Sequence, residues 1–209
     1  MPTPDTQVLP GYTWDSRLGT GRFRDARTGR MISSRTIAQT LATVQDSTAQ
    51  QLGAMARAAV EGEISVAVFQ RAAMEVLKQT SAGATALAHG GWDRVPQAAW
   101  GRTGASLKRE YRYLAEFARE IANGTIGADA AATRAELYAD AAYGRYWAES
   151  QRRAAERNYG AERLITAGDD RVCPTCREQE SRSWQPIGAF AVPVHLRCRC
   201  RLRYYGDEA

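Results

Sequence analysis

The chain has 209 residues, of which 44% are hydrophobic and 24% are charged, and its formal net charge is +5 at pH 7. These fractions are ordinary for a globular protein, so they exclude wholesale disorder, and the length suffices to build a hydrophobic core. Because no apolar run reaches about eighteen residues, we expect no transmembrane helix and no membrane partner. The N-terminus has neither the basic start nor the apolar stretch of a secretory signal, so we expect no export.

Residues 1–33 predict an arm followed by a hairpin. Residues 1–11 are rich in Pro and Thr, which is typical of a loose arm. Two short extended runs, 22–25 and 30–32, flank a turn that contains Gly29, and this pattern predicts a two-stranded hairpin. Because an isolated hairpin is marginally stable in water, we expect it to pack against another part of the chain.

Residues 34–160 predict a domain of about four helices, since apolar residues recur there at helical spacing. Ser33 or Ser34 can cap the first helix and Ser65 the second, because a hydroxyl accepts a bond from an otherwise unpaired backbone N–H. The clearest helix has an apolar side from Leu107 to Ile121 and a charged side opposite. Glycines mark the predicted breaks and ends: Gly62, Gly90-Gly91, Gly124 and Gly160.

Residues 161–209 predict a separate small module. Thr, Val, Cys, Pro and Trp replace the Ala, Glu and Arg of the helical segments. The strand candidates are 164–166, 189–192 and 202–205, and turn signals lie between them. The predicted fold class is therefore mostly α, with a short N-terminal hairpin and a small C-terminal module of β or α+β type.

All four cysteines of the chain lie in this module, with a histidine close to the second pair. The pattern is C-x2-C-x18-H-x2-C-x-C, formed by Cys173, Cys176, His195, Cys198 and Cys200. A turn that carries C-x2-C can direct two thiolates to one tetrahedral metal, and the second cluster supplies the other ligands. The spacing thus predicts one structural zinc ion, which replaces the core that a segment of about forty residues cannot build.

Several alternatives to this zinc site stay open. Two disulfides would need an oxidising compartment, and a thioredoxin-like pair would need C-x-x-C to open a helix, whereas Gln, Glu and Ser follow Cys176. Four ordinary buried thiols are a further alternative. Five candidate ligands also compete for four positions: either Cys200 is spare, or Cys198 and Cys200 both bind and His195 hydrogen-bonds a thiolate or is an ordinary surface histidine.

Arginine supplies almost all of the positive charge, since only Lys78 and Lys108 are lysines. This bias is typical of a GC-rich genome, but arginine also suits bidentate contacts to phosphate or carboxylate. Four arginines alternate near the end of the chain and are candidates for contact with nucleic acid or an acidic protein surface: Arg197, Arg199, Arg201 and Arg203.

The sequence contains no familiar catalytic constellation. H-E-x-x-H, the deaminase motif, a Walker loop and G-x-S-x-G are all missing, and a thiolate-rich zinc shell leaves no open position for a substrate. We therefore expect a protein that is not an enzyme.

The order of these features resembles the minor head proteins of tailed bacteriophages. The early part of the resemblance rests on Gly21-Arg22-Phe23-Arg24-Asp25, on the Gly90-Gly91 break before Trp92, and on Tyr111 to Ala118. The segment from Arg163 to Tyr205 is similar to the C-terminal module of the phage Mu F-like head morphogenesis family. That part rests on Cys-Pro-x-Cys, on Trp184 to Gly188, and on His-x-x-Cys-Arg-Cys. Family members often have Pro-x-Cys where this chain has Leu196-Arg197-Cys198.

The resemblance implies a minor capsid protein of low copy number, bound to the portal inside the head and active in head assembly and in DNA packaging or release. The implied partners are the portal protein, the major capsid protein and packaged DNA, and the implied location is the virion, or the host cytoplasm during assembly. The main alternative is a nucleic-acid-binding zinc-ribbon protein with a helical oligomerisation domain. An enzyme of phage or toxin origin is a third possibility.

Overall fold

The part of the chain that the structure describes contains four long helices. The computed structural model describes residues 12–14, 23–89, 92–156, 159–194 and 198–205. Its long helices are α1 (Ser34–Val60), α2 (Val66–His89), α3 (Gln97–Ala122) and α4 (Ala128–Ala155), and a short 3-10 helix, η1 (Trp92–Arg94), precedes α3. The predicted helical body is confirmed. None of the helices in these ranges is long and apolar enough to cross a membrane.

The ends of the helices follow from local chemistry that the sequence already indicated. Ser33 caps α1, because its hydroxyl accepts a hydrogen bond from the backbone N–H of Thr36 at 3.1 Å. The Ser65 hydroxyl accepts a bond from the N–H of Val68 at the start of α2. Gly62 and Gly124 follow α1 and α3 with φ values of 79° and 66°, a left-handed conformation that glycine adopts without strain.

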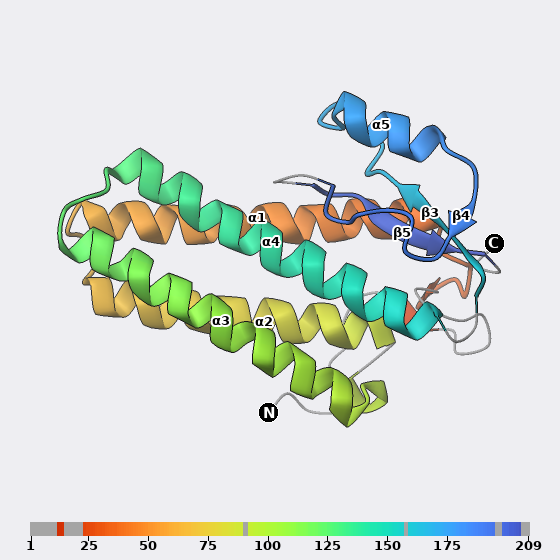
Figure 1. Cartoon of the computed structure of the whole chain (residues 1–209), viewed down its shortest axis with the longest axis horizontal. Coiled ribbons are helices and arrows are strands. Elements are labelled where there is room, and N and C mark those ends of the chain that lie inside the picture. Colours follow the sequence, from red (N-terminus) through yellow and green to blue (C-terminus); the bar gives the residue numbers. More distant parts are fainter. Residues whose placement is uncertain (1–11, 15–22, 90–91, 157–158, 195–197, 206–209) are drawn as a thin grey trace.

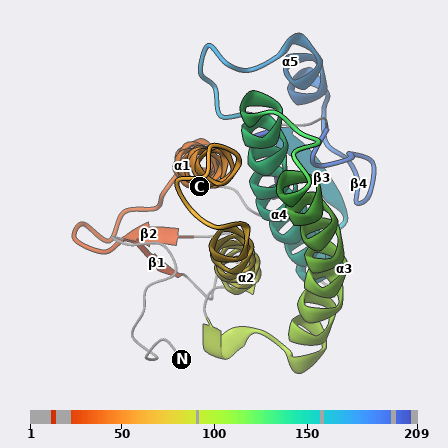
Figure 2. The ribbon, with the colours of Figure 1, turned by 90° about the vertical axis from the view of Figure 1, so that its left-hand side faces the viewer.

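The four long helices pack around one apolar core. α1 and α3 lie on opposite sides of the pair formed by α2 and α4, as Figure 2 shows in a view along the bundle. The centre holds Phe69 and Phe117, whose rings meet edge to face with centroids 5.7 Å apart, and the buried Trp147 of α4. The helices therefore form a bundle with its own core.

The N-terminal segment contains a predicted turn and a strand that was not predicted. Strand β1 (Tyr12–Trp14) pairs antiparallel with β2 (Phe23–Asp25). The turn predicted after β2 is present, since the N–H of Asp25 donates to the carbonyl of Arg30 and the N–H of Ile32 donates to that of Phe23. Phe23 is buried in the helical core, which confirms that the hairpin packs against another part of the chain.

The C-terminal module is a three-stranded antiparallel sheet with one short helix. β3 (Ala161–Ile165) lies between β4 (Gln185–Pro186) and β5 (Arg201–Tyr204), and α5 (Pro174–Ser181) lies on the connection between β3 and β4. Figure 1 shows the module beside one end of α1 and α4. The stacked rings of Tyr159 and Tyr204 belong to an apolar cluster that includes Ala155 of α4.

The strand predicted at 189–192 is wrong. That segment is a loop, and the third strand of the sheet is β4 instead. Side chains replace a strand ladder as partners of the loop backbone: the N–H of Phe190 donates to the buried carboxylate of Glu162 at 3.0 Å, and Arg152 donates to the carbonyl of Phe190. Phe190 still packs into the module core, so the segment 189–192 has an apolar pattern that is typical of a strand.

Candidate metal centre

Three cysteine sulfurs meet inside the C-terminal module. The Sγ atoms of Cys176, Cys198 and Cys200 all lie within 4.8 Å of one another, and all three residues are buried. Sulfurs around a tetrahedral zinc ion lie about 3.8 Å apart, because Zn–S bonds are about 2.3 Å long. Small side-chain movements therefore suffice to bring these thiolates to bonding distance, and the three cysteines can hold a metal ion.

The fold brings the two cysteine pairs together from distant parts of the module. Cys173 is the N-cap of α5, its Sγ accepts a hydrogen bond from the N–H of Cys176 at 3.4 Å, and Pro174 occupies the first turn. Cys198 and Cys200 directly precede β5, which pairs with β3. Helix α5 therefore orients the first pair, and the sheet places the second pair beside it.

The argument against a thioredoxin-like pair, that a sequence rich in Gln, Glu and Ser follows Cys176 in place of a helix, is wrong. Cys173 and Cys176 instead open the helix α5, which follows strand β3. The cysteine cap, a proline at the first position, and Glu and Gln, which are good helix formers, together explain the helix. What distinguishes the site from an isolated redox pair is the presence of two more thiols beside Cys176. None of the four cysteines, all of which are described, forms a disulfide in the structure.

A small cavity adjoins the cysteine cluster. Its volume is about 20 Å³, and Cys173, Cys176 and Cys200 line it together with Arg171 and Arg199. A volume of this size accommodates one water-sized sphere. Cys173 is only partly buried, and it lines this cavity together with two of the clustered cysteines. An ion therefore fits beside these three thiols without unfolding the module.

The surroundings favour neutral thiols until a metal binds. Burial raises the pKa of Cys176 to about 12, and the neighbouring thiols of Cys198 and Cys173 add to this rise. A hydrogen bond with Cys198, together with burial, raises the pKa of Cys200 far above its ordinary value. A metal ion reverses this preference, because coordination favours the thiolate and releases the proton.

Metal affinity should rise with pH, because each thiol must lose its proton before it binds the ion. Each thiol that is protonated in the metal-free chain makes the affinity about tenfold higher per pH unit. We expect the metal-free module to be unfolded and its thiols to be solvated, so the affinity should level off near the ordinary thiol pKa of about 8.5. Competition with a coloured chelator between about pH 6 and 9.5 measures the effect. An affinity that still rises steeply at about pH 9.5 would contradict the prediction and would show that the metal-free module stays folded around its buried thiols.

Polar contacts connect the metal centre to helix α1. Gln45, which is fully buried, donates from Nε2 to the carbonyl of Cys198 at 3.3 Å and accepts from Arg201 at 3.0 Å. Its neighbour Asp46 pairs with Arg171 at 2.7 Å. Neither residue of α1 was predicted from the sequence, although there was a signal: Gln45 is a polar residue at an apolar position of the helix, seven residues before Leu52.

Three of the four alternating arginines contact other groups of the same chain. Arg199 forms two hydrogen bonds with Asp169, at 2.6 and 2.7 Å, and lowers the pKa of that carboxyl group. Arg201 is buried and donates to the carbonyl of Cys200, while Arg203 lies over the ring of Trp184. These contacts support the module itself. The predicted contact with a nucleic acid or portal protein stays a prediction, and Arg201 would have to leave the interior to make one.

Two of the predicted site residues, His195 and Arg197, lie outside the described residues. Whether His195 completes the metal shell is therefore still a prediction. Among the described residues, three cysteine sulfurs lie close together, and Cys173 lines the cavity beside two of them.

No family model matches the chain, and neither a curated protein nor a solved structure matches it. The resemblance to phage head morphogenesis proteins consequently depends on the sequence motifs named above.

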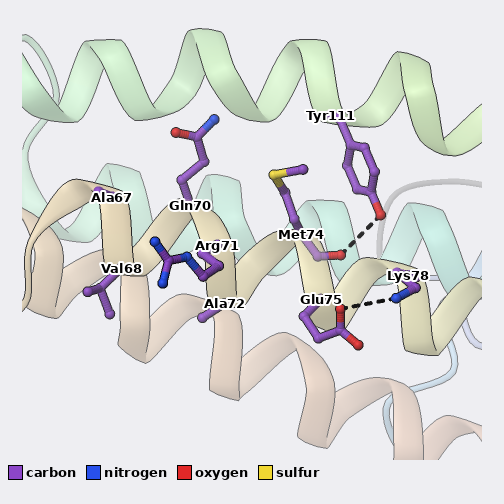
Figure 3. A pocket seen from close by; sticks show the side chains of 9 residues that line it. All are labelled: Ala67, Val68, Gln70, Arg71, Ala72, Met74, Glu75, Lys78 and Tyr111. Atoms are coloured by element: carbon purple, nitrogen blue, oxygen red, sulfur yellow. Dashed lines mark hydrogen bonds and ion pairs between the residues drawn. The ribbon is translucent and has the colours of Figure 1, made fainter. Parts of the chain in front are cut away.

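A larger groove lies on the helical body, away from the cysteines. It has a volume of about 880 Å³ and runs along α2, with Tyr111 of α3 as its far wall (Figure 3). The Tyr111 hydroxyl donates to the carbonyl of Met74 at 3.3 Å, and Lys78 pairs with Glu75 at 3.4 Å. These groups therefore have partners within the two helices that border the groove.

Proposed function

We propose that the cysteine cluster is a structural zinc centre whose four ligands are Cys173, Cys176, Cys198 and Cys200. A set of four soft sulfur donors favours zinc, and four thiolate ligands would leave no position open for a substrate. The observation that carries this proposal is the meeting of three buried sulfurs within 4.8 Å, with Cys173 on the adjoining cavity. A catalytic zinc site would need an open position and a base.

The zinc centre has a mechanical role in this proposal. The module contains a small sheet and a short helix, which bury few large side chains of their own. Zinc fixes the two cysteine pairs to each other, and Gln45 and Asp46 then hold that unit against α1. The result is a rigid unit in which the end of the chain has a defined position on the helical body, as a component of a larger assembly requires.

We further propose that the chain is a structural, non-enzymatic minor capsid protein of a tailed phage. In this role it binds the portal inside the head, contacts the major capsid protein, and assists head assembly and DNA packaging or release. The support is the resemblance to the Mu F-like head morphogenesis family, and the zinc-fixed module agrees with that resemblance. The chain would act in the host cytoplasm during assembly and remain in the virion afterwards.

The test of this role is the composition of purified particles. Phage particles from a strain that carries the gene should contain peptides of this chain, at few copies per particle by quantitative mass spectrometry. A tagged copy should also capture the portal protein from infected cells. Abundant chain in the lysate with none in the particles would contradict the capsid role and favour the alternative of a zinc-ribbon regulator.

A further inference from the structure

The outer face of α3 carries an exposed row of basic side chains. At 3.6 residues per turn, its cations fall on one side of the helix, opposite Leu107, Leu114 and Phe117 of the core. All of them are exposed: Arg102, Lys108, Arg109, Arg112 and Arg119. Glu116 is the one acidic residue on this side. We call these five cations the α3 basic face.

The other two acidic residues of α3 form ion pairs with arginines of α4. Glu110 pairs with Arg145 at 3.1 Å, and Glu120 pairs with Arg134 at 2.7 Å. Within the described ranges, by contrast, no cation of the α3 basic face forms an ion pair, and Arg109 only donates to the hydroxyl of Ser106 at 3.2 Å. Because arginines of α4 neutralise Glu110 and Glu120, the outer side of α3 keeps a strongly positive net charge.

The face is also open. A side chain added at Gly101 or Gly104 would meet nothing within 4 Å. Figure 2 shows α3 at an edge of the molecule, with α2 and α4 on its inner side. Tyr113 is the one large apolar residue exposed on this face, with 54% of its surface accessible. A single aromatic ring does not provide the apolar surface that a membrane-bound helix or a protein hot spot needs.

We propose that the α3 basic face binds duplex DNA through its phosphates. The face spans about 26 Å from Arg102 to Arg119 at 1.5 Å per residue, which matches about seven base pairs of B-DNA. Four of its five cations are arginines, whose planar guanidinium suits bidentate contact with phosphate. α3 contains no Asn or Gln from Gly101 to Ala122, the side chains that read adenine, so binding is largely independent of base sequence.

The geometry favours duplex DNA over other nucleic acids. Single strands bind to rows of aromatic rings, and this face has only Tyr113. Duplex RNA has a deep, narrow major groove that a helix does not enter. This assignment extends the proposed function, since it gives the packaged DNA a different surface from the arginines near β5. DNA binding by the α3 basic face requires neither the zinc ion nor incorporation into the virion. A failure of this inference can therefore be distinguished from a failure of the zinc proposal or of the capsid proposal.

The test is a binding titration of the full chain with a fluorescein-labelled DNA duplex of about 25 base pairs, at several salt concentrations. The variant replaces Arg102, Arg109, Arg112 and Arg119 with glutamine, which has nearly the same helix propensity as arginine. We expect the dissociation constant to rise at least about tenfold and the salt slope to fall by about 0.9 for each phosphate that the variant no longer neutralises.

The matched control removes the same charge from exposed positions on other elements: Arg27→Gln, Arg30→Gln, Arg94→Gln and Arg153→Gln. It should weaken binding less than about threefold, since only the general charge changes. Circular dichroism verifies that both variants are folded. Equally weakened binding in the two variants would overturn the proposal, as would a wild-type chain that does not bind at about 0.05 M salt. Binding of polyglutamate or duplex RNA as tightly as DNA would overturn the choice of partner.

Discussion

Removing the metal from the purified protein with a strong chelator should unfold the C-terminal module and leave the four long helices folded. The module core is small, and in the proposed zinc centre the metal joins its two cysteine pairs. The free energy of metal binding would then also be folding free energy. Structural zinc contributes about 10–16 kcal/mol in isolated zinc-finger peptides, which exceeds the stability of most domains. Elemental analysis should first find one zinc ion per chain.

Hydrogen exchange followed by mass spectrometry locates the effect. Backbone amides of β3 and β5 should exchange rapidly after chelation, while those of α2 and α3 stay protected, because their core does not include the cysteines. Cys176→Ser and Cys198→Ser should reproduce the metal-free pattern. Thr175→Ser, at an exposed position between the first two cysteines, is the matched control and should keep both metal and protection. Protected β3 and β5 in a metal-free chain would show that the sheet is stable without the ion; paired disulfides would remove the zinc proposal altogether.

Replacing Arg152 with methionine should destabilise the protein by about 3 kcal/mol, the lower end of the range for a broken buried ion pair. The side chain of Glu162 is 0% exposed, and Arg152 lies 3.4 Å from each of its oxygens. Methionine keeps much of the packing volume but leaves the carboxylate without its cation and the carbonyl of Phe190 without this donor. Urea unfolding, monitored by circular dichroism and tryptophan fluorescence, measures the change.

Two further variants separate the broken charge pair from a general effect. Arg153→Met removes the neighbouring exposed arginine of the same helix and should change the free energy of unfolding by less than about 0.5 kcal/mol. In the double variant Arg152→Met, Glu162→Met, the buried charge is gone, so much of the stability should return. If the double variant is destabilised by the sum of the changes measured for the two single variants, the two residues act independently.

The helical body could be predicted from the sequence because its signals are local. Ser33, Gly62 and Gly124 act within one turn of their own position, and the apolar side of α3 repeats every three to four residues. The cysteine cluster was equally visible, since all four thiols lie within a short stretch. These features require no knowledge of which distant residues meet.

The parts that were missed depend on long-range contacts. Glu162 and Arg152 supply partners for the backbone of Phe190, so a segment with the pattern of a strand becomes a loop. Arg201 turns inward because Gln45, over 150 residues away in the chain, offers an acceptor. The helix α5 was not predicted because its N-cap is a cysteine, which is not among the residues that typically cap helices.

The position of the second cysteine pair has a consequence for the order of biosynthesis. Cys198 and Cys200 follow all four long helices and the central strand β3, so during translation they leave the ribosome after the bundle can already have formed. The sheet is also completed only after this segment is synthesised, because its strand β5 begins directly after Cys200. In the proposed zinc centre, metal uptake would thus be a late step, made on a chain whose α1 already presents Gln45 and Asp46. A chain truncated before these codons would contain all four long helices but lack β5 and the second cysteine pair.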